Sequence, residues 1–254
     1  FGCAGGIDGT FTFPYTKISP DKGTSALMIK VTGLKGGHSG MDIILGRGNS
    51  CKILTRLLWH GVSDHGLKLS YIEAGNMRNA IPREGYAIVT VPSSEKVKFE
   101  NCIGKLAEDI KSELSVTEPS LSISVSDTSM PATIMDTDTQ NRILRAVYGC
   151  PNGVMRMSDA MQGLVETSTN LSIISTDDKA VVVKCLLRSS VNSAKADLAL
   201  MMGSIFELAG AQVVFEGEYP GWKPNPDSAI LKTMQKVYND YFGKVPELKA
   251  IHAG

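Results

Sequence analysis

A single histidine in a glycine-rich segment is the residue of this sequence best placed to do chemistry. His38 lies in Gly33-Leu-Lys-Gly-Gly-His-Ser-Gly40, between a strand pattern and a helix pattern. Glycine adopts backbone conformations closed to other residues, so such a segment can hold a side chain outward in a shaped loop. The pattern indicates a ligand site. A solvated histidine, a metal ligand or a phosphate contact would also fit, whereas the Walker phosphate-loop motif is not matched.

An arginine near the end of another strand pattern is the next candidate. Arg188 follows apolar residues in Lys184-Cys-Leu-Leu-Arg-Ser-Ser190. Its planar guanidinium suits a carboxylate, because two N–H groups can bind both oxygens at once. The residues alone leave open whether Arg188 binds a substrate carboxylate or faces water. Asn79 lies between two strand patterns, where a hairpin connection explains it as well as a substrate role does.

Composition narrows the class of protein. The 254 residues are 43% hydrophobic and 20% charged, which is typical of a globular chain with ample core. The 26 basic and 26 acidic residues balance, so neither nucleic acid nor an anionic membrane is expected as a partner. Five scattered cysteines without Cys-x-x-Cys spacing predict reduced thiols and a cytoplasmic protein. No apolar run long enough to span a bilayer is found.

Periodicity predicts two copies of one α+β unit. In residues 24–127 the pattern gives a strand, the His38 loop, a helix capped by Asn49, two strands, a helix and a strand. Residues 139–216 repeat the order helix, strand, strand, helix, strand. The first copy reads as a ferredoxin-like split β-α-β unit, and Asn79 and Asn170 are expected at similar places in the two copies. A chance succession of elements in an α+β chain is the alternative.

Three motifs resemble one enzyme family. Gly33 to Asn49, Gly75-Asn-Met-Arg-Asn-Ala-Ile-Pro-Arg-Glu84 and Tyr219-Pro-Gly-Trp222 occur in the order found in bacterial Xaa-His dipeptidases. These enzymes belong to the di-zinc metallopeptidases that include carnosinase and carboxypeptidase G. The resemblance covers nearly the whole chain.

The resemblance implies roles for three residues, His38, Arg188 and Asn170. His38 matches a histidine that stabilises the oxyanion when metal-bound water attacks the scissile carbonyl. Arg188, with Asn170 upstream, matches groups that bind the substrate, and Asn79 is a further substrate-binding candidate. The family holds two zinc ions through His-x-Asp, Glu-Glu and other ligands. Neither motif occurs here, so the metal ligands are expected outside these residues, and the chain alone is expected to be inactive.

The resemblance also implies a division of the chain. Residues 1–5 would end a first catalytic-domain segment, residues 6–210 would form a lid, and residues 211–254 would begin a second catalytic-domain segment. The sequence therefore predicts a fragment of a cytosolic zinc dipeptidase that acts on Xaa-His dipeptides, with a homodimer left open. The alternatives are a non-catalytic dimerisation or binding module, and an aminoacylase or carboxypeptidase of the same family. His252 is expected to be a buried structural histidine.

Overall fold

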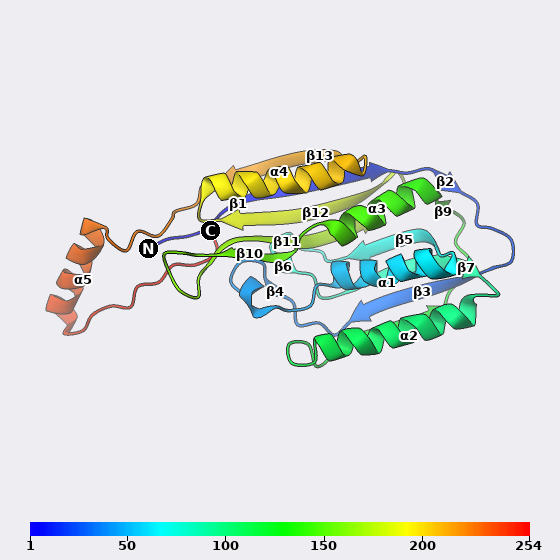
Figure 1. Ribbon diagram of the computed structural model, residues 1–254, viewed down its shortest axis with the longest axis horizontal. Coiled ribbons are helices and arrows are strands. Elements are labelled where there is room, and N and C mark those ends of the chain that lie inside the picture. Colours follow the sequence, from blue (N-terminus) through cyan, green and yellow to red (C-terminus); the bar gives the residue numbers. More distant parts are fainter.

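A nine-stranded antiparallel sheet organises the computed structural model, which describes residues Phe1–Gly254 (Figure 1). The strand order is β13-β1-β12-β11-β5-β7-β3-β8, and β10 pairs with β11 beside this path. In that order the strands are β13 (Gln212–Tyr219), β1 (Gly5–Pro14), β12 (Ala180–Ser189), β11 (Val165–Thr176), β5 (Lys68–Ala74), β7 (Gly85–Pro92), β3 (Thr24–Thr32) and β8 (Ser122–Asp127), with β10 at Gly153–Met157. All neighbouring strands are antiparallel, which confirms the α+β class.

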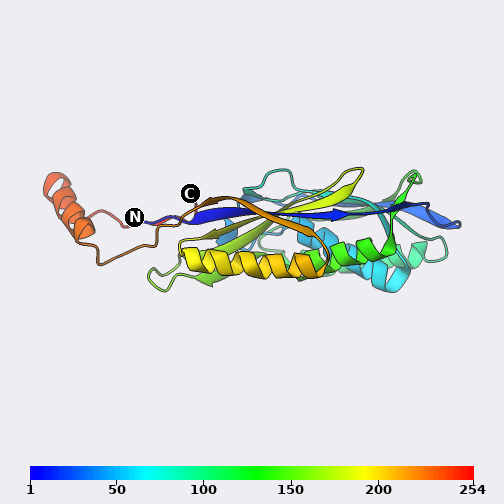
Figure 2. The same ribbon diagram turned by 90° about the horizontal axis from the view of Figure 1, so that it is seen from above.

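Four helices cover one face of this sheet, as Figure 2 shows. They are α1 (Ser50–His65), α2 (Lys96–Glu113), α3 (Thr137–Gly149) and α4 (Asn192–Leu208). The predicted cap of α1 is confirmed, because the Asn49 side chain accepts a hydrogen bond from the Lys52 N–H. One continuous apolar core runs beneath all four helices. Within it the ring of Phe11 in β1 stacks on that of Phe206 in α4, with centroids 3.8 Å apart.

The strand order contains two units of the same connectivity, and the second begins with β1 rather than at residue 139 as the sequence predicted. The first copy is β3-α1-β5-β7-α2-β8, and its strands lie in the order β5-β7-β3-β8. The second copy is β1-α3-β11-β12-α4-β13, and its strands lie in the corresponding order β11-β12-β1-β13. Each copy is ferredoxin-like. The leading strand of the second copy is β1, so the first copy is inserted between β1 and α3.

The two copies meet at β5 and β11. Ala74 pairs with Ile174 in antiparallel register, as a local twofold relation between equivalent strands requires. The hydroxyl of Thr176 accepts from the Ile72 N–H at 3.1 Å and donates to the Ile72 carbonyl at 2.8 Å. On the helix layer, Lys52 of α1 donates to three carbonyl groups at the end of α3. A cation there stabilises the negative end of the helix dipole.

Short elements complete the fold. The ribbons are β2 (Lys17–Ile18) with β9 (Ile134–Met135), and β4 (Gly37–His38) with β6 (Ala80–Ile81), followed by the 3₁₀ turn η1 (Ile43–Leu45). Helix α5 (Ala229–Phe242) lies apart from the sheet and buries none of its residues (Figure 1). No helix combines the length and the apolar character needed to cross a membrane.

The extended segments at the two chain ends lie side by side. Cys3 pairs with both Trp222 and Ile251 through the backbone. The Trp222 side chain is exposed, and backbone pairing with Cys3 orders this segment. Strand β13, in which the sequence placed the start of a catalytic-domain segment, pairs with β1 within the common sheet. All five cysteines are free thiols.

Candidate active site

The His38 loop takes its shape from two close approaches that only glycine permits. Gly37 has φ of 147°, and a Cβ atom there would lie 2.3 Å from Nη1 of Arg47. A Cβ atom on Gly40 would lie 2.0 Å from the His252 carbonyl oxygen. The β4–β6 ribbon then fixes the register of the loop, because His38 pairs with Ala80. The glycines recognised in the sequence therefore serve tight packing around His38.

The hydrogen bonds around His38 define its tautomer. Its Nδ1 accepts from the backbone N–H groups of Gly40 at 3.0 Å and Met41 at 3.1 Å. A nitrogen that accepts two hydrogen bonds carries no proton, so the neutral ring bears its hydrogen on Nε2. Burial and the positive charge of Arg188 both lower the pKa of His38, whereas Asp42 acts in the opposite direction. His38 is thus a neutral donor through Nε2 near pH 7.

A buried carboxylate that sequence reasoning missed holds both ends of the His38 loop. Glu118 is only 2% exposed. Its two oxygens accept from the N–H of Lys35 at 2.8 Å and of Gly48 at 2.9 Å, one on each side of His38. Glu118 lies 83 and 70 positions from these partners, so no local pattern could have revealed the contact. Glu118 thus connects the two ends of the His38 loop, and we call this pair of hydrogen bonds the clamp.

Arg188 is buried without an anionic partner. Its exposed fraction is 3%, which shows that the alternative of a water-facing strand end was wrong. Nη1 donates to the Tyr219 hydroxyl at 3.0 Å, and Nε lies 3.5 Å from Oγ of Ser39, next to His38. No ion pair of the chain involves Arg188. The second copy therefore supplies a buried cation beside the histidine of the first.

The two asparagines differ in their surroundings. Asn170 lies within β11 and is fully buried, and its Nδ2 donates to the Ala80 carbonyl at 2.8 Å. Its Oδ1 is buried without a hydrogen-bond partner. Asn79 lies in the exposed connection after β5, and its backbone carbonyl accepts from the Ser39 N–H at 2.9 Å. The two residues do not occupy similar places in the copies, contrary to the sequence expectation, because only Asn170 is part of a strand.

The predicted burial of His252 is confirmed. This residue is 6% exposed, and its Nε2 lies 2.7 Å from Oγ of Ser168. Burial is the main cause that lowers its pKa to about 4, and the charge of Arg188 adds to the effect. Its Nδ1 has no partner. Because its carbonyl lies against Gly40, His252 brings the C-terminal segment onto the His38 loop.

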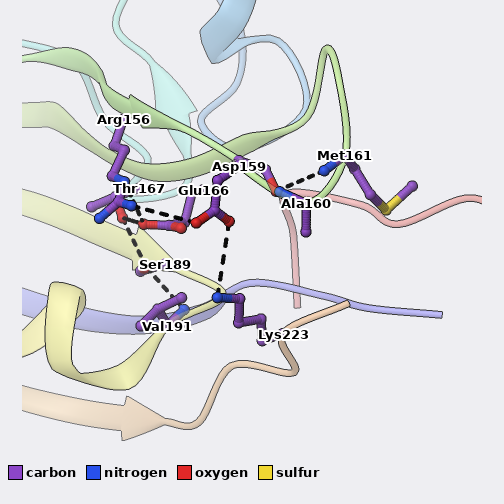
Figure 3. Close-up of polar contacts among 10 residues, drawn as sticks. Arg156, Asp159, Ala160, Met161, Glu166, Thr167, Ser189, Val191 and Lys223 are labelled. Carbon is purple, nitrogen blue, oxygen red and sulfur yellow. Dashed lines mark hydrogen bonds and ion pairs between the residues drawn. The ribbon is translucent and has the colours of Figure 1, made fainter. Parts of the chain in front are cut away.

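Charged contacts connect the β10–β11 loop to the segment that follows β13 (Figure 3). Nε of Arg156 lies 3.4 Å from the buried carboxylate of Glu166, and its Nη2 lies 3.7 Å from Asp159. Asp159 in turn lies 3.9 Å from Nζ of Lys223, in the segment that follows β13. Asp159 and Lys223 are exposed, so this contact contributes little to stability. It does set the loop beside the chain ends.

A groove of about 560 Å³ adjoins the His38 loop. Its wall includes Gly36 and Gly37 of the loop, together with the charged or phenolic groups of Glu73, Arg83 and Tyr86. The chain contains no group of three or more His, Cys, Asp or Glu side chains that could hold a metal ion. His38 cannot ligate through Nδ1, which its loop occupies.

The class of domain follows from a family model. Residues 29–118, most of the first copy, match the peptidase dimerisation domain of the M20 type. The chain thus carries an M20 dimerisation domain, and the second copy lies outside the matched residues.

Two relatives match the whole chain. Aminoacylhistidine dipeptidase from Vibrio alginolyticus superposes with a TM-score of 0.96 and 40% identity, over 100% of this chain and 52% of that one. The cytosol non-specific dipeptidase of Escherichia coli (strain K12) is 34% identical over 253 residues, which are 100% of this chain and 52% of the relative. The chain is therefore homologous to M20 dipeptidases, as the sequence motifs indicated. It spans about half the length of these relatives.

Proposed function

We propose that this chain is the substrate-binding lid of a metal-dependent dipeptidase. The observation that carries the proposal is Arg188, a buried guanidinium without a carboxylate partner beside a neutral histidine donor. Leaving a charge buried and unpaired costs several kcal/mol, so such a group is rarely retained for stability alone. The terminal carboxylate of a dipeptide would supply the missing anion, held by the planar fork of the arginine.

His38 and Asn170 complete the proposed contacts with the substrate. The Nε2–H of His38 would donate a hydrogen bond to the scissile carbonyl oxygen. This hydrogen bond would become stronger as negative charge develops on that oxygen. The fixed Nδ1 contacts support this role, because they hold the ring and its tautomer before the substrate binds. The unpaired Oδ1 of Asn170 is an acceptor suited to a substrate donor. Asn79 is proposed as an outer contact, since its side chain is exposed.

The remaining partners lie beyond this chain's residues. Two zinc ions would be held by residues outside the chain and would supply the nucleophile for peptide hydrolysis. Residues 6–210 are proposed as the lid proper, with β13 attached to its sheet and the segment from Pro220 leading to the catalytic domain. The name of the Escherichia coli relative and the free thiols support a cytoplasmic enzyme.

The duplication supports an active site completed within one chain. His38 comes from the first copy, and Arg188 and Asn170 come from the second. The β5 edge that a single dimerisation domain would leave open is paired with β11 here. A homodimer would therefore form through other surfaces. The alternative function, a non-catalytic dimerisation module, would need the β5 edge to be free for a second copy. The pairing with β11 argues against it.

Substrates with and without a terminal carboxylate test the proposal. The full-length zinc-loaded enzyme should hydrolyse Ala-His much better than its C-terminal amide. Arg188→Gln should abolish most of this preference by raising KM for the free acid. A control variant, Arg56→Gln, removes an exposed ion pair with Glu113 and should leave both substrates unaffected. Equal hydrolysis of acid and amide by the unchanged enzyme would refute the role given to Arg188.

A further inference from the structure

Two glycines leave room for the ring of Tyr219 at the point where the chain leaves the lid. Tyr219 is the last residue of β13, and it pairs with Gly6 at the start of β1. A Cβ atom on Gly6 would lie 2.6 Å from the Tyr219 hydroxyl oxygen, and one on Gly254 would lie 2.8 Å from its ring. Any larger residue at either position would displace the phenol. The ring therefore fits between the chain ends only with glycine at both positions.

The hydroxyl of Tyr219 accepts a hydrogen bond within the chain but donates none. Nη1 of Arg188 donates to it at 3.0 Å. A guanidinium has no acceptor, so the hydroxyl oxygen accepts this bond and its own hydrogen stays available. Among residues 1–254 no acceptor bonds to that hydrogen. A free O–H donor therefore lies next to the unpaired guanidinium, on a half-buried residue.

The backbone of Tyr219 is also anchored. Nζ of Lys195, in the first turn of α4, donates to the Tyr219 carbonyl. Lys195 is 1% exposed, and it also forms an ion pair of 3.2 Å with Glu218. Its remaining contact is the Gly6 carbonyl at 3.5 Å. The buried Lys195 ammonium thus contacts both the first and the last strand of the second copy. It holds the backbone of Tyr219, whose side chain reaches Arg188.

We propose that Tyr219 orients Arg188 and donates its own hydroxyl hydrogen to the terminal carboxylate of the substrate. This inference rests on the proposed function, because it takes Arg188 to be the carboxylate-binding group. A carboxylate accepts several hydrogen bonds, and it would receive one from the phenol and others from the guanidinium. Tyr219 would then make the site selective for free carboxylates over amides, because an amide presents N–H groups to two donors.

Tyr219→Phe tests this role, since it removes the hydroxyl and keeps the ring between the glycines. In the full-length enzyme we expect KM for Ala-His to rise about tenfold, the effect of losing one hydrogen bond to a charged group, with kcat within about twofold. KM for Ala-His amide should not change. In an Arg188→Gln background, Tyr219→Phe should add little further loss, because the two groups act on one carboxylate.

Tyr15→Phe is the matched control. The Tyr15 hydroxyl also donates one hydrogen bond, to the Asp177 carbonyl at 2.8 Å, but it lies at the opposite end of β1. That variant should leave the kinetics unchanged. The proposal would be overturned if Tyr219→Phe raised KM equally for the acid and the amide. It would also be overturned if the variant differed from the unchanged enzyme only by a lower melting temperature.

Calorimetric binding separates this inference from the proposed hydrolysis. L-Histidine should bind the full-length protein more tightly than L-histidinamide, and Tyr219→Phe should weaken only the former, by about tenfold. Should the protein fail to hydrolyse dipeptides but still show this pattern, the proposed function would fall while Tyr219 kept its role as a carboxylate donor. Unchanged L-histidine affinity in Tyr219→Phe would refute the role of Tyr219 alone.

Discussion

Replacement of Glu118 by glutamine should loosen the His38 loop. The carboxylate of Glu118 accepts one N–H from each end of this loop, from Lys35 and from Gly48. An amide keeps one oxygen acceptor and turns an NH₂ group toward the second N–H. One buried donor then faces another donor, and the charge that strengthened the remaining bond is lost. Loss of a hydrogen bond to a charged group costs about 1.5–3 kcal/mol, which is our expectation for the free energy of unfolding.

Urea unfolding of this chain measures that cost. Glu113→Gln is the control, since Glu113 is half-exposed and pairs with Arg56 on the surface, where the loss should stay below about 1 kcal/mol. In the full-length enzyme Glu118→Gln should also lower kcat about tenfold, because small displacements of a catalytic group reduce the rate. If Glu118→Gln were as stable as Glu113→Gln and equally active, the clamp would have no role in positioning His38.

Three further predictions follow from the site. His38→Ala in the full-length enzyme should lower kcat about 100- to 1,000-fold with little change in substrate affinity, and a change in KM alone would contradict an oxyanion role. The pKa of His252 is about 4 in the folded chain against an ordinary value of 6.5, so the unfolded state takes up the proton first as pH falls below 6.5. Stability present well above pH 6.5 should therefore decline by about 2.5 kcal/mol on going to pH 4.5, and urea unfolding of His252→Gln should lack this part of the decline. A full-length His38→Ala chain mixed with one whose metal ligands are replaced should stay inactive in a turnover assay, since recovery would mean that His38 acts across subunits.

The sequence determined the elements whose signals are local. Apolar residues that recur every three or four positions predicted α1, α2 and α4. The Asn49 cap marked where α1 begins. The glycine-rich segment identified the His38 loop, because tight backbone conformations restrict residue type. Motifs in chain order indicated the family resemblance. These features depend on neighbours within a few residues, so they can be read before the chain is folded.

Only the tertiary structure decided how distant segments complete each other. It joined β1 to the second copy across the whole inserted first copy, a pairing that no local pattern encodes. It buried Arg188 beside Ser39, resolving an alternative that the strand pattern had left open, and it brought Glu118 to the two ends of the His38 loop. Side-chain burial and long-range hydrogen bonds depend on which surfaces meet in space. Residue type and spacing set what a group can do, and the antiparallel pairing of the two copies sets which groups act together.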